Sequence, residues 1–209
     1  MVGSKFVISK LTIKSKLIMG QYYKIVRLAS KKKNYPNKEK AVEYLSPYDY
    51  DNGAKLMEFS WKNNNFVGAL ENLINKENGA WTGSHIIVAG DYADAEPYTL
   101  NGKRWNIYDL ACEYATKLVN IEPKHYRYLI NEDKKQFFDV EKCKANKNGW
   151  TIHPLTLLLA DGNSRGNGDY MSKNSRRVGC WKRNIVVTSD NRPNENEYKE
   201  IFIDWVEEW

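Results

Sequence analysis

Apolar residues recur along this chain with two different periods, and each period predicts a type of element. A helix is predicted over residues 66–74, where one face would carry Phe66, Val67, Leu70, Leu73 and Ile74. A second helix is predicted within 105–119, with Leu110, Ala111, Tyr114 and Leu118 on one face. A shorter helix should follow Asp51 or Asn52, because either side chain can cap it.

Strands are predicted where apolar runs are short or alternate with polar residues. The predicted strands are 19–28, 86–89, the two arms of a hairpin over 125–140, 152–160, 178–190 and 198–209. The lysine-rich stretch 30–40 is predicted to be an exposed turn. Residues 1–18 form either an N-terminal strand or an extension before Met19.

The order of these elements favours an α+β fold. Regular strand–helix–strand alternation is missing, so we expect a largely antiparallel sheet with two or three helices packed on one side. Residues 19–209 are long enough for a single α+β domain.

Composition narrows the class of protein. With 42% hydrophobic and 13% aromatic residues, the chain has enough apolar material for a core. A formal net charge of +6 favours anionic partners such as nucleotides, nucleic acid or an acidic protein surface. No apolar run reaches the roughly 18 residues of a membrane helix, so no membrane partner is expected. The 3 widely spaced cysteines and the lack of a signal-peptide pattern favour a cytoplasmic location.

The glycine-rich loop, residues 162–170 (GNSRGNGDY), is the first candidate binding element. Its backbone N–H groups, especially at Gly166 and Gly168, would form a nest for a phosphate. Arg165 would add a bidentate contact, and Tyr170 would stack on a ring. Because the glycine spacing matches neither common phosphate-binding fingerprint, a plain polar turn remains the alternative.

The acidic loop, residues 91–96 (DYADAE), is the second candidate and follows a predicted strand. Asp91 or Asp94, beside Tyr92, would meet a ribose hydroxyl or an amine, and Trp181 would stack on a base. If the two loops met, Asp169 would complete a carboxylate set suited to Mg²⁺. A solvated acidic loop is the alternative.

No complete catalytic motif is present, so enzymatic activity stays open. The histidines His85, His125 and His153 lack a zinc-peptidase spacing, and no G-x-S-x-G sequence occurs. Aromatic residues near polar turns, namely Trp61, Trp81 and Trp150, are expected to include some rings that line a pocket mouth.

Five segments carry a resemblance to other proteins: MGQYYKIV, DYDNGAKLMEFSW, IIVAGDYAD, LLLADGNSRGNGDY and VGCWKRNIVV. Over residues 19–205 the chain resembles a loose group of uncharacterised bacterial and phage proteins that begin near MGQYYK and carry a GDYAD element. The resemblance implies a prokaryotic or phage cytosolic protein and transfers no catalytic residue.

The leading functional hypothesis is a binding domain for a nucleotide-like or other anionic small molecule, held between the two loops. One alternative is a phage or mobile-element inhibitor of a host defence complex (anti-CRISPR-like). It would bind a host protein or an RNA–protein complex through residues 31–40 and the first strand. The other alternative is a metal-dependent nucleotide hydrolase or transferase with Asp91, Asp94 and Asp169 as metal ligands.

Overall fold

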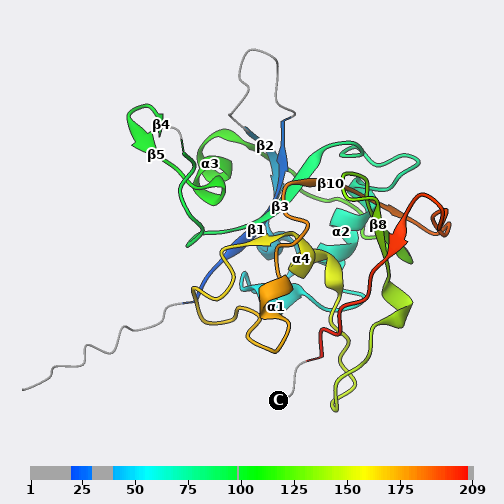
Figure 1. Ribbon diagram of the computed structural model, residues 1–209. Coiled ribbons are helices and arrows are strands. Elements are labelled where there is room, and N and C mark those ends of the chain that lie inside the picture. The colour runs from blue at the N-terminus through cyan, green and yellow to red at the C-terminus, as the bar shows by residue number, and fades with distance from the viewer. Residues whose placement is uncertain (1–19, 30–39, 98, 207–209) are drawn as a thin grey trace, which may run out of the picture.

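A computed structural model describes residues 20–29, 40–97 and 99–206 (Figure 1). The strand or extension predicted at 1–18 and most of the lysine-rich turn lie outside these residues.

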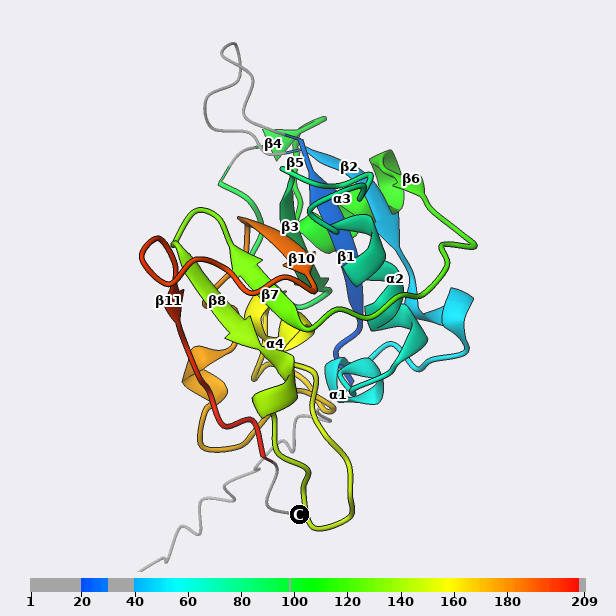
Figure 2. The same ribbon diagram turned by 90° about the vertical axis from the view of Figure 1, so that its right-hand side faces the viewer.

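A single large sheet organises the fold, in the order β11-β8-β7-β10-β3-β1-β2-β6, with β9 beside β3 (Figure 2). Its strands are β1 (Tyr23–Leu28), β2 (Ala41–Leu45), β3 (His85–Gly90), β6 (Thr116–Lys117), β7 (Tyr128–Asn131), β8 (Gln136–Asp139), β9 (Ala160–Asp161), β10 (Asn184–Ser189) and β11 (Lys199–Glu200). The longer strands pair antiparallel, and the two-residue strands β6, β9 and β11 pair parallel. The predicted α+β class and mostly antiparallel sheet are confirmed.

Helices cover both faces of the sheet. The α-helices are α1 (Leu56–Phe59), α2 (Asn65–Leu73), α3 (Ile107–Tyr114) and α4 (Pro154–Leu159). Three of them, α1, α2 and α4, contribute to the main apolar core on one face, together with Ile25 and Val88. The neighbouring residues Val26 and Ile87 point the other way and pack in a smaller apolar cluster with residues of α3. This alternation follows from the two-residue period of a strand.

Residues 152–160 were predicted as a strand, and that prediction is wrong for most of the segment. They form α4, and only Ala160 continues into β9. Pro154 occupies the first turn, where its missing N–H costs nothing, and the His153 ring accepts a hydrogen bond from Leu155 N. Because every residue of α4 is buried, the apolar run has no polar face that would have revealed a helical period.

Three other element boundaries also differ from the predictions. The helix predicted within 105–119 ends at Tyr114, since Thr116–Lys117 pairs with β2 as β6. The strand predicted at 178–190 begins only at Asn184. Of the one predicted at 198–209, the part described by the structure, up to residue 206, contains only β11. In each case pairing partners rather than local propensity set the boundary. The helix predicted at 66–74 is confirmed as α2, with Asn64 accepting from Phe66 N and Val67 N.

The strands β4 (Thr99–Leu100) and β5 (Lys103–Arg104) form a separate hairpin. Within the described ranges, no helix has the length and apolar character needed to cross a membrane.

Candidate functional site

The glycine-rich loop and the acidic loop meet in the folded protein. The strands before them, β9 and β3, pair in parallel, with Ala89 opposite Asp161, so both loops leave the sheet at the same edge. There the Arg165 guanidinium donates to both carboxylate oxygens of Asp94, at 2.8 and 2.7 Å, and to the backbone oxygen of Tyr92 at 2.8 Å. The charges that were expected to meet a ligand therefore bind each other.

The predicted phosphate nest holds an internal carboxylate. The backbone N–H groups of Arg165 and Gly166 donate to Asp169 Oδ2 at 2.9 and 3.0 Å. The buried hydroxyl of Tyr23 donates to Asp169 Oδ1 at 2.7 Å. Burial, and then the Asp169 charge, raise the pKa of Tyr23, which therefore stays protonated as the donor. A phosphate entering this loop would have to displace Asp169.

The remaining residues predicted for this site are held within the protein. Asp91 Oδ1 accepts from Tyr22 N at 3.0 Å, and burial raises the pKa of its carboxyl despite that bond. The Tyr170 ring is buried edge-on against Trp205, with 5.3 Å between ring centroids. Trp181 is also buried, and its Nε1 donates to Gln136 Oε1 at 3.1 Å. Neither ring exposes a face on which a base would stack.

The buried Gln21 side chain accounts for the glycines at the start of both loops. A methyl group at Gly90 or Gly162 would collide with the Gln21 amide, and Gly162 also has a positive φ of 97°. The backbone oxygen of Gly168 accepts from Met57 N at 3.0 Å, which ties the loop to α1. The two glycines are therefore explained by the close packing of both loops against Gln21, which lies just before β1.

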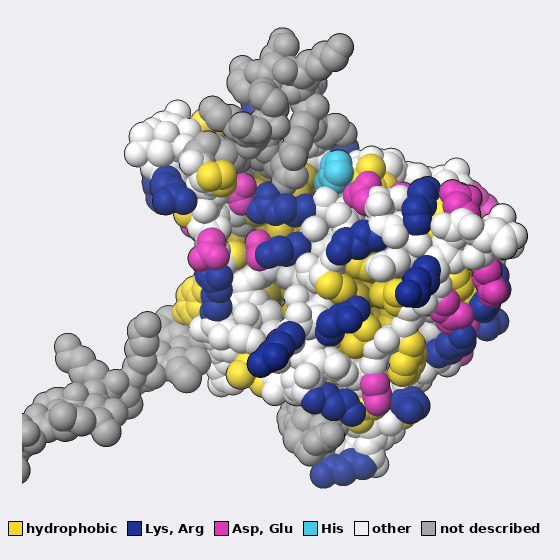
Figure 3. Space-filling view, in the orientation of Figure 1, with side chains coloured by type: hydrophobic (Ala, Val, Ile, Leu, Met, Phe, Trp, Pro, Cys, Tyr) yellow, Lys and Arg dark blue, Asp and Glu magenta, His cyan; other side chains and the backbone are white. Residues whose placement is uncertain are grey.

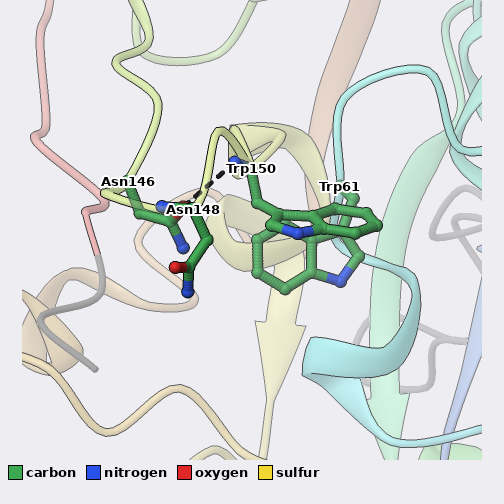
Figure 4. A pocket seen from close by; sticks show the side chains of 4 residues that line it. All are labelled: Trp61, Asn146, Asn148 and Trp150. Carbon is green, nitrogen blue, oxygen red and sulfur yellow. Dashed lines mark hydrogen bonds between the residues drawn. The ribbon is translucent and has the colours of Figure 1, made fainter.

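A surface pocket of about 270 Å³ lies elsewhere, lined by Trp61, Asn146, Asn148 and Trp150 (Figure 4). The two indole rings are 5.6 Å apart between centroids and tilted by 64°. Trp61 is fixed by a 2.7 Å hydrogen bond from Nε1 to Met57 O, whereas Trp150 is 60% exposed. This indole pocket combines an exposed aromatic ring with two amides.

The loop that carries Trp150 has hydrogen bonds of its own. Asn146 Oδ1 accepts from Asn148 N and from Trp150 N, both at 3.0 Å. The Asn148 amide and Asn146 Nδ2 have no protein partner among the described residues. Trp61, Trp81 and Trp150 were expected to include some rings that line a pocket mouth. Trp61 and Trp150 line this pocket, whereas Trp81 is buried and its Nε1 donates to Glu43.

A second pocket, of about 250 Å³, contains a cluster that the sequence reasoning missed. Its walls are formed by Lys62, Asn63, His125, Tyr126, Arg127, Val140, Glu141, His153 and Asp190. Behind the histidines lies Glu71 on α2, whose carboxylate is fully buried. Its Oε2 accepts from His125 Nδ1 at 2.7 Å, and its Oε1 lies 3.4 Å from His153 Nε2. We call this second pocket, together with the buried Glu71 behind it, the histidine pocket.

The sequence contains little sign of this cluster, because Glu71, His125 and His153 are 54 and 28 residues apart along the chain. Glu71 occupies a helix face that is otherwise apolar and buried. A charged residue at a buried helix position is the one local sign that a partner must exist.

Metal binding finds no direct support in this geometry. In the part of the chain that the structure describes, no group of three or more His, Cys, Asp or Glu side chains is placed to hold a metal ion. Asp94 and Asp169, two of the predicted magnesium ligands, are engaged with Arg165 and with Tyr23.

Comparison of the chain with protein-family models, curated proteins and solved structures finds no match. The resemblance to bacterial and phage proteins therefore stays a prediction. The function is inferred from the residues and their geometry.

Proposed function

We propose that this protein is a binding domain for a nucleotide-like ligand and that the indole pocket is its binding site. The observation that carries the proposal is the exposed Trp150 ring beside the Asn148 amide and Asn146 Nδ2, neither of which has a protein partner among the described residues. Stacking of a base on an exposed aromatic ring is worth about 1–3 kcal/mol. Asn amides pair well with the donor and acceptor edge of a base.

Positive charge next to the pocket supports an anionic ligand. Lys144 and Lys147 lie on the Trp150 loop, are exposed, and form no ion pair within the described residues. A phosphate attached to a stacked nucleoside would be attracted to these ammonium groups. Figure 3 also shows Lys and Arg side chains spread across one face of the molecule. Residues 170–189 contribute to the positive charge, since they include five Lys or Arg and no acidic residue.

Replacing Trp150 with alanine is expected to raise the Kd for nucleoside monophosphates by about 5- to 150-fold, the range that corresponds to losing one stacked base. Isothermal titration calorimetry with the four monophosphates measures the change. Because Trp150 is exposed, the variant should keep its melting temperature. Trp105→Ala is the matched control, since that ring lies beside Lys103 near α3 and should leave the Kd unchanged.

Two further measurements separate the alternatives. Lys144→Gln with Lys147→Gln should weaken binding of monophosphates but not of nucleosides, because only the phosphate contact is removed. Tighter binding of single-stranded RNA than of any mononucleotide would favour the alternative in which the protein binds an RNA–protein complex of a host. No heat of binding with any nucleotide at millimolar concentration would contradict the proposal.

A further inference from the structure

The two histidines of the histidine pocket carry the ring proton on different nitrogen atoms. His153 Nδ1 accepts from Leu155 N, so the proton of this ring is on Nε2 and points to Glu71. Both nitrogens of His153 are thereby used. His125 donates Nδ1–H to Glu71, so its free lone pair is on Nε2. That nitrogen has no hydrogen-bond partner among the described residues.

Glu71 therefore acts on His125 as an orienting carboxylate. A buried acid that accepts from Nδ1 fixes the tautomer of the ring and stabilises the imidazolium that forms when Nε2 takes a proton. The fit of the ring against α2 is close, since a methyl group on Gly68 would lie 2.8 Å from His125 Cε1. His125 still has 34% of its side chain exposed and lines the pocket.

The charges around the pocket balance, which selects against a highly charged substrate. Lys62 pairs with Glu141 at 2.8 Å. Arg127 pairs with Asp139 at 3.0 Å, and its backbone N–H donates to Asp190. The Asn63 amide lines the same pocket and has no partner in the described part of the chain. A free amide of this kind can donate its N–H groups to an oxygen that gains negative charge.

We propose that the histidine pocket hydrolyses an uncharged carboxylic ester, with His125 as the general base, Asn63 as the oxyanion donor and Glu71 as a positioning residue. His125 Nε2 takes a proton from water while the water oxygen bonds to the carbonyl carbon. The tetrahedral oxyanion collapses, the ester C–O bond breaks, and the leaving alkoxide takes the proton from Nε2. The products are a carboxylic acid and an alcohol.

The test measures release of p-nitrophenolate from p-nitrophenyl acetate and butyrate by the full-length protein. We expect saturable turnover that falls by about 10²–10⁴-fold in His125→Asn. His85→Asn is the matched control, because His85 lies outside the pocket and its Nδ1 contacts Arg183 O. The difference between this variant and wild type reports how much a histidine outside the pocket contributes to the hydrolysis.

Two further variants distinguish a loss of catalysis from a loss of folding. Asn63 is exposed and has φ +65°, a conformation that glycine adopts without strain, so Asn63→Gly should fold normally and lower kcat by about 10²-fold. Glu71→Gln should lower kcat with little change in KM, which a purely structural role would not produce. Absence of saturable turnover in the folded wild-type protein would overturn the proposal, as would turnover that survives in both His125→Asn and Asn63→Gly.

Discussion

Replacement of Glu71 by alanine should lower the free energy of unfolding by about 3–5 kcal/mol at pH 7, the cost of removing one partner from a buried charge cluster. The Glu71 carboxylate is fully buried and connects α2 to His125, to the backbone N–H of Tyr126 and to His153. Without it, the His153 ring stays buried with an unpaired N–H. Urea denaturation followed by tryptophan fluorescence measures the change.

Glu77→Ala is the matched control for this prediction. Glu77 follows α2, is exposed, and forms no ion pair among the residues that the structure describes, so its removal should change stability by less than about 0.5 kcal/mol. A loss below about 1 kcal/mol in Glu71→Ala would show that the cluster contributes little to the fold.

The stabilising effect of Glu71 should also depend on pH. Burial alone would raise the pKa of this carboxyl, but His153 and His125 outweigh burial and hold the pKa below its ordinary value. A lowered pKa in the folded state stabilises the protein above the unfolded pKa of about 4.3, and this stabilisation is lost as pH falls through the folded pKa. The difference in unfolding free energy between wild type and Glu71→Ala should therefore shrink below about pH 4.

The sequence predicted best where an element carried a clear local signal. The helix α2 combines an apolar stripe with the Asn64 cap, and both signals are local. Strand β3 was found from its short apolar run, which is also a local signal, although both of its faces are buried. The helix α4 was missed because it is buried all round, so its composition resembled that of a central strand. Strand β11 was overextended because its length depends on how many residues pair with β8, and only Lys199 and Glu200 do so.

The candidate site was predictable in part. Both loops follow short strands, and the structure brings them together through the pairing of β9 with β3. Their complementary charges, the feature that suggested a shared ligand, instead produce the Arg165–Asp94 ion pair. The sequence alone does not distinguish a carboxylate that binds a ligand from one that accepts hydrogen bonds within the protein. The indole pocket was only hinted at by tryptophans near polar turns, and the histidine pocket depends on tertiary contacts alone.

Replacement of Asp169 by alanine is the second prediction with a large expected effect, a loss of about 2–4 kcal/mol in the free energy of unfolding. Asp169 is 5% exposed and accepts three hydrogen bonds, from Tyr23 OH, Arg165 N and Gly166 N. Each buried donor left without an acceptor costs about 1–3 kcal/mol, and water entering from the loop surface should satisfy some of them. Thermal and urea unfolding measure the loss.

Asp94→Ala separates this internal role from the surface ion pair of the same two loops. Asp94 is 85% exposed on its side chain, and solvent screens its attraction to Arg165, so the variant should unfold almost like wild type. Tyr23→Phe provides the partner measurement, because a double-mutant cycle with Asp169→Ala should give a coupling energy of at least about 1 kcal/mol. Equal stability losses in Asp94→Ala and Asp169→Ala would contradict the internal role of Asp169. A large loss confined to Asp169→Ala would show that the glycine-rich loop is shaped around a carboxylate of its own.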